Sequence, residues 1–178
     1  EDSVPQTYTE AVHCPESDKW RLAMDREYEA LMKNVTWKLV DSPEGRKTVK
    51  GKWLYKIKYK NDGTVDKYKA RFVAESFSQR YGIDFEETFS PTTRMATVRV
   101  LLSFAIHHGM SLHHLDVKGA YLHSTLEEEI YLDQPKGYEK FDDGGANYAC
   151  RLLKGIYGLK QAGRRWYETL DECLIQSG

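Results

Sequence analysis

The chain has 178 residues and a formal net charge of −1, with 40% apolar and 30% charged residues, the proportions of an ordinary folded domain. No apolar run approaches the roughly 20 residues that span a bilayer, and no basic-then-apolar leader follows Glu1, so neither a membrane partner nor a secretory signal is expected. Three widely spaced cysteines without a Cys-x-x-Cys pair argue against a disulfide framework and a cysteine zinc site, and favour a reducing compartment.

Positive charge is concentrated between residues 46 and 71. Ten lysines and arginines lie there against two acids, Asp62 and Asp66, so this segment carries +8 and the remainder of the chain −9. A basic surface confined to one part of a nearly neutral chain indicates a polyanionic partner at that face.

The N-terminal part of the chain predicts one helix and one strand. Residues 1–15 have little periodicity and are expected to form a lead-in segment without regular structure. Residues 16–34 predict a helix, residues 36–40 a short strand and residues 41–45 a turn. The helical spacing is carried by Trp20, Met24, Tyr28 and Leu31.

A β-hairpin over residues 51–74 is the clearest local prediction. Apolar and basic residues alternate on both sides of Asn61-Asp62-Gly63, which supplies the turn. The apolar face comprises Trp53, Tyr55, Ile57, Tyr59, Tyr68, Ala70 and Phe72. The basic face comprises Lys52, Lys56, Lys58, Lys60, Lys67, Lys69 and Arg71. Merely solvated lysines are the alternative, but so many cations in one hairpin favour contact with phosphates.

The rest of the chain predicts helices over residues 96–108 and 161–176, and strands over residues 111–117, 128–135 and 148–153. Loops are expected over 80–94 and 136–147. The acids of the first loop are expected to be solvated or to pair with the basic hairpin. The side chains expected to face inward from the two helices are Val98, Leu101, Leu102, Ala105, Trp166, Leu170 and Cys173.

The stretch LHHLDVKGAYLH, residues 112–123, combines one acid with three histidines. His113 and His114 would point to opposite faces of a strand, so they cannot easily share one zinc ion, and a zinc site is not favoured. Asp116 could cap a helix that begins near Gly119 or could be catalytic, and its spacing does not decide between the two. Two-metal phosphoryl transfer needs further carboxylates beside it.

Four long runs follow one another from Trp20 to the end of the chain: WRLAMDREYEALMKNVTWKLV, KWLYKIKYKNDGTVDKYKARFVAESFSQRYGIDFEETFSP, LHHLDVKGAYLHSTLEEEIYLDQPKGY and CRLLKGIYGLKQAGRRWYETL. Together they resemble the reverse transcriptase of copia-type long-terminal-repeat retrotransposons. The resemblance implies an α+β fold, the fingers and partial palm of a right-hand polymerase, with an antiparallel sheet flanked by helices. The fingers would span about residues 16–110 and the partial palm about 111–178.

The resemblance also implies the roles of particular residues. Asp116 would be catalytic and would hold two Mg²⁺ ions, with the backbone carbonyl of Val117 as a further metal ligand. Lys69 or Arg71 would grip the triphosphate of the incoming nucleotide. Tyr121 would lie under its sugar and discriminate against a 2′-hydroxyl. Gln161 would contact the same nucleotide, while Lys52, Lys56, Lys58, Lys60 and Lys67 would bind nucleic acid.

Three positions depart from the family pattern: Glu75-Ser76 replaces Lys-Gly, and Gly163 replaces proline. The family's other catalytic aspartates belong to a Tyr-x-Asp-Asp hairpin, and Asp142-Asp143 does not have that context. The resemblance therefore implies part of a polyprotein that continues with the rest of the palm and an RNase H, uses template-primer and deoxynucleoside triphosphates, and acts in cytoplasmic virus-like particles or the nucleus. Alone, the chain is expected to be inactive. The alternatives are a remnant that binds nucleic acid without catalysis, and a purely structural or protein-interaction module.

Overall fold

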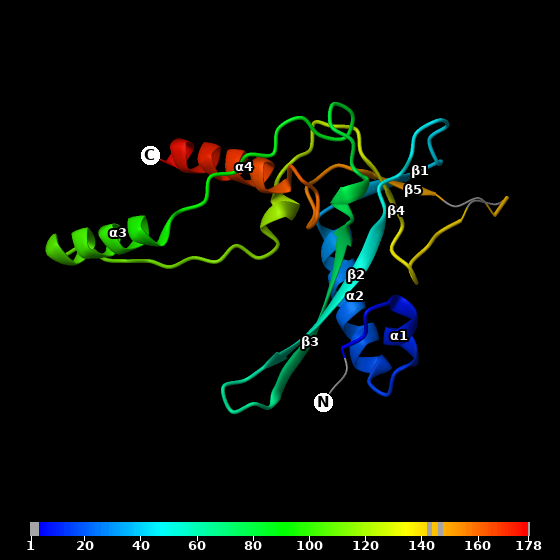
Figure 1. The fold of residues 1–178 in the computed structure, drawn as a ribbon, viewed down its shortest axis with the longest axis horizontal. Coiled ribbons are helices and arrows are strands. Elements are labelled where there is room, and N and C mark those ends of the chain that lie inside the picture. The colour runs from blue at the N-terminus through cyan, green and yellow to red at the C-terminus, as the bar shows by residue number, and fades with distance from the viewer. Residues whose placement is uncertain (1–3, 142–143, 146–147, 178) are drawn as a thin grey trace.

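The computed structural model describes residues 4–141, 144–145 and 148–177, which form helices and antiparallel sheets (Figure 1). The predicted α+β class is confirmed. The elements in chain order are α1 (Tyr8–His13), α2 (Ser17–Lys33), β1 (Trp37–Val40), β2 (Gly51–Tyr59), β3 (Val65–Ala74), the 3₁₀ helix η1 (Ser76–Ser78), α3 (Met95–His107), the 3₁₀ helix η2 (Ala120–His123), β4 (Tyr131–Asp133), β5 (Ala149–Leu152) and α4 (Ala162–Ser177).

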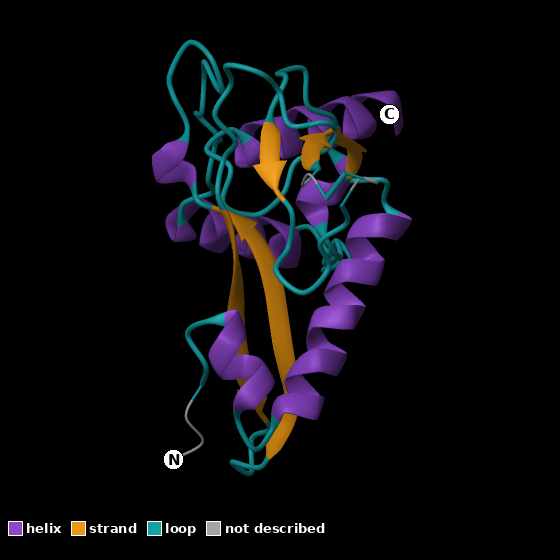
Figure 2. Cartoon of the chain, turned by 90° about the vertical axis from the view of Figure 1, so that its right-hand side faces the viewer, coloured by secondary structure: helices purple, strands orange, loops and turns teal. Residues whose placement is uncertain are grey.

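Strands β2 and β3 form the predicted antiparallel hairpin, which is the longest feature of the molecule (Figures 1 and 2). Alternation places Trp53, Ile57 and Phe72 on its buried face, each less than 10% exposed. At the tip, the carboxylate of Asp62 accepts a hydrogen bond of 2.9 Å from the backbone of Thr64. The turn is thus built by the residue type that favours it.

Helix α2 runs alongside the hairpin and packs against β3 (Figure 2). The ring of Trp20, which is 1% exposed, meets the rings of Tyr55 and Tyr68 edge-on, at centroid distances of 5.3 and 4.7 Å. Met24 and Leu31 are buried one and three turns further along the same face. The predicted amphipathic helix is confirmed, and it supports the hairpin from one side.

The N-terminal segment contains a helix that the sequence analysis did not predict. Helix α1 is capped by Thr7, whose hydroxyl accepts a hydrogen bond of 3.2 Å from the backbone of Glu10, and Ala11 is fully buried. The expectation of irregular structure up to residue 15 was wrong, because a helix of six residues is too short to show a periodic pattern.

Strands β1, β5 and β4 form a second antiparallel sheet in that order. Trp37 lies opposite Leu152, and Tyr131 lies opposite Arg151, so β5 is central although it is the last strand in the chain. The strands predicted over residues 36–40, 128–135 and 148–153 are confirmed, although β4 has only three residues. Ile130 and Leu132 are fully buried where this sheet meets the base of the hairpin.

Two expectations between residues 95 and 117 were wrong. Residues 111–117 are exposed and form no strand, because no described segment pairs with them. Helix α3 forms as predicted, but Leu101 and Leu102 are 59% and 42% exposed. Within the described structure, Ala105 is the only buried residue of this helix, which stands away from both sheets (Figure 1). Helix α4 forms with Trp166 and Leu170 half-buried, whereas Cys173 is exposed rather than inward.

Candidate functional site

A cavity of about 630 Å³ lies between β3, helix α2 and the segment that carries Asp116. Its lining includes six cationic side chains and two acids: Arg26, Lys58, Lys67, Lys69, Arg71, Lys118, Glu27 and Asp116. Val117 and Tyr157 also line the cavity. The structure therefore brings together Asp116, Val117, Lys69 and Arg71, which the sequence analysis had singled out from distant parts of the chain.

Strand geometry explains why the cations gather. Lys67, Lys69 and Arg71 alternate along β3 and share one face, and the register places Lys58 opposite Lys67 and Lys56 opposite Lys69. Like charges directly opposite each other destabilise a sheet. A hairpin that keeps two such pairs has a face suited to an anionic partner.

The pKa of Lys69 is shifted by its place in this cluster of cations. Burial lowers the pKa of Lys69 below its usual range, and the nearby charges of Arg71 and Lys58 lower it further. A bound anion would counter both effects, since it favours the charged amine.

Glu27, which the sequence analysis missed, is the buried partner of Arg71. Its carboxylate is 7% exposed and accepts a charged hydrogen bond from the Arg71 guanidinium, whose side chain is one-third exposed. Burial raises the pKa of Glu27, against the lowering effect of Arg71. The sequence did contain a signal, because Glu27 lies at helical spacing on the face of Trp20, Met24 and Leu31, where an acid needs a partner.

Asp116 is exposed at the rim of the cavity. The 3₁₀ helix η2 begins after it at Ala120, its N-cap residue is Gly119, and no side chain caps it. The alternative in which Asp116 caps a helix is therefore wrong. His123 contacts the backbone carbonyl of Lys118 at 3.3 Å, and the described residues contain no group of three or more His, Cys, Asp or Glu side chains that could hold a metal ion.

The structure does not bring Tyr121 and Gln161 to the wall of this cavity. Tyr121 is half-buried, and its ring meets that of Tyr157 at a centroid distance of 4.8 Å. Gln161 is fully buried: it accepts a hydrogen bond of 3.1 Å from the amide of Gln79 and donates one of 2.8 Å to the carbonyl of Asp84. In this conformation the amide of Gln161 is occupied within the protein rather than turned to a ligand.

The remaining predicted lysines lie outside the cavity lining. Lys52 forms an ion pair of 3.1 Å with Glu75, the acid that departs from the family pattern. Lys56 is exposed on the basic face of β2, and Lys60 lies at the tip, where its backbone closes the turn with Thr64. Glu75 thus neutralises one cation at the base of the hairpin, and the exposed cations continue toward the tip.

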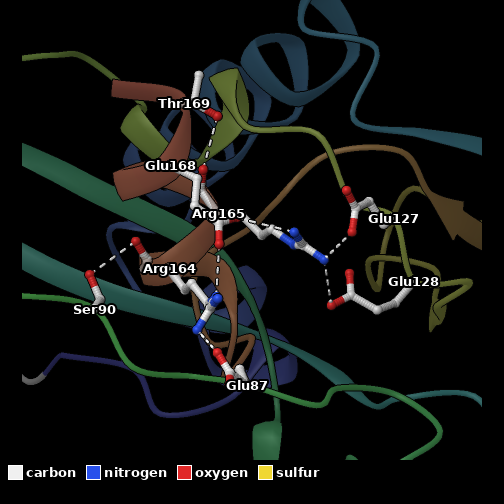
Figure 3. A network of polar contacts seen from close by, with 9 residues as sticks. Glu87, Ser90, Glu127, Glu128, Arg164, Arg165, Glu168 and Thr169 are labelled. Atoms are coloured by element: carbon white, nitrogen blue, oxygen red, sulfur yellow. Dashed lines mark hydrogen bonds and ion pairs between the residues drawn. The ribbon is translucent and has the colours of Figure 1, made fainter. Parts of the chain in front are cut away.

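A second polar cluster fixes the start of helix α4 (Figure 3). Arg165 contacts Glu127 at 2.7 Å and Glu128 at 3.2 Å, while Arg164 pairs with Glu168 at 2.8 Å and also with Glu87. Glu86 and Glu87 are exposed, as expected for solvated acids of residues 80–94, but the cation that Glu87 pairs with belongs to α4 and not to the hairpin. Cations and acids neutralise each other here, in contrast to the cationic cavity.

The other two departures from the family pattern, Gly163 and Ser76, lie within regular local structure. The carbonyl of Gly163 accepts a hydrogen bond of 3.1 Å from the Ser90 hydroxyl (Figure 3), and Ser76 begins the 3₁₀ helix η1. Asp142 and Asp143 lie outside the described residues. No helix in the described part of the chain is both long and apolar enough to cross a bilayer.

Comparison with known proteins identifies the family. Residues 34–178 match the family model described as reverse transcriptase (RNA-dependent DNA polymerase). The chain is 44% identical over 174 residues to the retrovirus-related Pol polyprotein from transposon TNT 1-94 of Nicotiana tabacum, an alignment that covers 98% of this chain and 13% of that protein. It is 39% identical over 178 residues to the corresponding polyprotein from transposon RE1 of Arabidopsis thaliana, covering 99% of this chain and 12% of that protein.

A more distant relative is the Transposon Ty1-ER2 Gag-Pol polyprotein of Saccharomyces cerevisiae, 33% identical over 170 residues, which cover 90% of this chain and 9% of that protein. The chain thus spans only about an eighth of the first two relatives. No solved structure matches it. The family model covers most of the chain and the relatives cover nearly all of it, so the chain belongs to the reverse transcriptase family, within the copia-type transposon Pol polyproteins.

Proposed function

We propose that the chain forms the nucleotide-binding side of an RNA-directed DNA polymerase that extends a primer on an RNA or DNA template. One observation carries this proposal: the cavity in which Asp116 faces the cations of the hairpin. In this assignment residues 16–110 correspond to the fingers and residues 111–178 to part of the palm of a longer polyprotein.

The cations of the cavity suit a triphosphate. Lys69 and Arg71 lie on one face of β3, and Lys118, two residues after Asp116, lines the same cavity. Guanidinium and ammonium groups form the strongest hydrogen bonds to phosphate oxygens. We propose that Lys69 and Arg71 grip the triphosphate, while Lys56 and Lys58 extend the basic surface toward the template-primer.

The residues beside Asp116 fit Mg²⁺. This ion prefers oxygen ligands, and it is usually held by one or two carboxylates together with substrate phosphates. Asp116 would supply a carboxylate, Val117 a carbonyl oxygen, and the triphosphate in the cavity the remaining oxygens. When bound, two Mg²⁺ ions stabilise the charge that develops during phosphoryl transfer. Further carboxylates would come from a Tyr-x-Asp-Asp hairpin, a motif that the 178 residues do not contain.

The first test is the effect of Asp116→Asn on nucleotide affinity with and without Mg²⁺. Without the ion, the Asp116 carboxylate repels a triphosphate, so Asp116→Asn should tighten dCTP binding by about fivefold. With Mg²⁺, the same variant should weaken binding by a similar factor, because a metal ligand is lost. Isothermal titration of the 178-residue chain measures both. Tighter binding under both conditions would show that Asp116 does not hold the ion.

Lys69→Ala is the companion variant. Loss of a charged hydrogen-bond donor should weaken dCTP binding at least about tenfold in either condition. Lys38→Ala removes the same charge from β1, away from the cavity, and should change the affinity less than about twofold. Equal effects of the two variants would assign the binding to overall charge and not to the cavity.

The chain alone is expected not to extend a primer, since Asp116 is the only one of the family's three catalytic aspartates that it contains. A primer-extension assay with Mg²⁺ and all four deoxynucleoside triphosphates tests this. Extension by the wild-type chain that Asp116→Asn abolishes would contradict the expectation. Extension that survives Asp116→Asn would indicate a contaminating polymerase.

A further inference from the structure

The turn around Tyr157 joins two segments that are far apart in the sequence. Gly155 donates a backbone hydrogen bond of 3.0 Å to the carbonyl of Ser124, next to the 3₁₀ helix that carries Tyr121. Two residues later, the carbonyl of Tyr157 accepts a hydrogen bond of 2.8 Å from the backbone of Ala74, at the end of β3. The backbone of this turn is therefore fixed at both ends.

Glycines make both contacts possible. A Cβ atom on Gly155 would lie 2.7 Å from the hydroxyl oxygen of Ser124 and 3.1 Å from the carbonyl oxygen of Tyr121. A Cβ atom on Gly158, whose φ is +92°, would overlap the carbonyl group of Ala74. Such close backbone approaches hold the two residues between the glycines, Ile156 and Tyr157, in a defined place.

The side chain of Tyr157 contacts two residues with different expected tasks: Arg71, which the proposed function assigns to the triphosphate, and Tyr121, for which the family resemblance implies contact with the sugar. The guanidinium carbon of Arg71 lies 5.6 Å from the centre of its ring, within the range of a cation–π interaction. The ring of Tyr121 meets it at 4.8 Å with an interplanar angle of 65°, a favourable edge-to-face geometry. Tyr157 also lines the cavity itself.

Glu27 is a second neighbour of Arg71. It holds the Arg71 guanidinium by an ion pair from helix α2, so this guanidinium contacts both a buried carboxylate and an aromatic ring. An arginine with two such neighbours loses less freedom when it meets a phosphate, because its planar head is already oriented.

Resting on the function proposed above, we propose that Tyr157 is a positioning residue of the nucleotide site. Its ring orients Arg71 toward the triphosphate and packs against Tyr121, which lies outside the cavity lining and would meet the sugar of an incoming deoxynucleotide from that position. One residue thereby couples phosphate binding to sugar discrimination. A role in packing alone would change the stability of the fold, but it would leave the preference between ribo- and deoxynucleotides as it is.

The test compares the affinities of the 178-residue chain for tripolyphosphate, dCTP and CTP in the presence of Mg²⁺. Tyr157→Leu should weaken tripolyphosphate binding by about two- to fivefold, the value of one lost cation–π contact. It should also lower the ratio of dCTP to CTP affinity by about threefold, since Tyr121 loses an edge-to-face neighbour. Tyr157→Phe keeps the ring and should retain both properties.

Tyr131→Leu is the matched control, because Arg46 lies 5.7 Å from the centre of the Tyr131 ring, outside the cavity. It should change neither the affinity nor the ratio. If Tyr157→Leu does not fold, Tyr157→Met keeps a similar volume without the ring and takes its place. An unchanged ratio in the folded variant would overturn the proposal, as would an equal change in Tyr157→Phe or Tyr131→Leu.

The two proposals fail in different ways. If wild-type chain does not bind dCTP, or if Asp116→Asn tightens binding with and without Mg²⁺, the proposed function fails and the positioning role fails with it. If wild-type chain binds dCTP, prefers it to CTP and shows the Mg²⁺ reversal at Asp116, but Tyr157→Leu behaves as wild type, only the role of Tyr157 is wrong.

Discussion

Arg71→Ala is expected to lower the free energy of unfolding by about 3 kcal/mol at pH 7, because it leaves the buried carboxylate of Glu27 without its counter-charge. This value is at the lower end for breaking a buried ion pair, since one-third of the Arg71 side chain is exposed. Urea unfolding measures the change. Lys67→Ala removes a cation from the same strand face without exposing a buried acid, and should cost less than about 0.5 kcal/mol.

The loss should shrink as the pH falls. Burial raises the pKa of Glu27 and Arg71 opposes that rise, so the folded-state pKa increases further in Arg71→Ala. A carboxyl group whose pKa is higher in the folded than in the unfolded state destabilises the fold above both values, and this penalty disappears as it binds a proton. Arg71→Ala should therefore cost less at pH 5 than at pH 7, and adding Glu27→Gln should restore most of the stability at pH 7. A loss that neither change reduces would contradict the assignment.

Gly158→Ala is expected to destabilise the fold by about 3 kcal/mol, of which about a third comes from the left-handed backbone and the rest from overlap with the Ala74 carbonyl. This change should also separate the turn of Tyr157 from the end of β3. Thermal or urea unfolding measures the loss.

Gly63→Ala isolates the backbone contribution. Gly63 has a φ of +83°, similar to the +92° of Gly158, but a Cβ atom there would meet nothing within 4 Å. The expected cost is about 1 kcal/mol. Equal losses for the two glycines would show that the close approach to Ala74 contributes nothing.

The spacing of apolar residues predicted those helices and strands in which this spacing is regular. The hairpin follows from strict alternation around Asn61-Asp62-Gly63, and helix α2 from the spacing of Trp20, Met24 and Leu31. The basic face of the hairpin, and with it Lys69 and Arg71, followed from the same alternation. Asp116 was predicted from a motif, and the structure places it at the rim of the same cavity.

Features that depend on distant partners were not predictable in this way. Residues 111–117 have the composition of a strand, but a strand exists only with a pairing neighbour. The burial of Gln161 depends on Gln79, eighty-two positions earlier in the chain. The importance of Tyr157 comes from contacts with Arg71 and Tyr121, which no local spacing reveals.

The lysine pairs across the hairpin give dissolved salt two opposite effects on this protein. Lys56 lies opposite Lys69 and Lys58 lies opposite Lys67. Counterions that screen the repulsion within these pairs therefore stabilise the hairpin of the free protein. The same ions compete with a polyanion for the lysines and loosen the complex. Low ionic strength should therefore favour the proposed complex with a polyanion, and high ionic strength should favour the free hairpin. In the proposed complex, bound phosphates would relieve the repulsion between the paired lysines, and this relief would add to the free energy of binding.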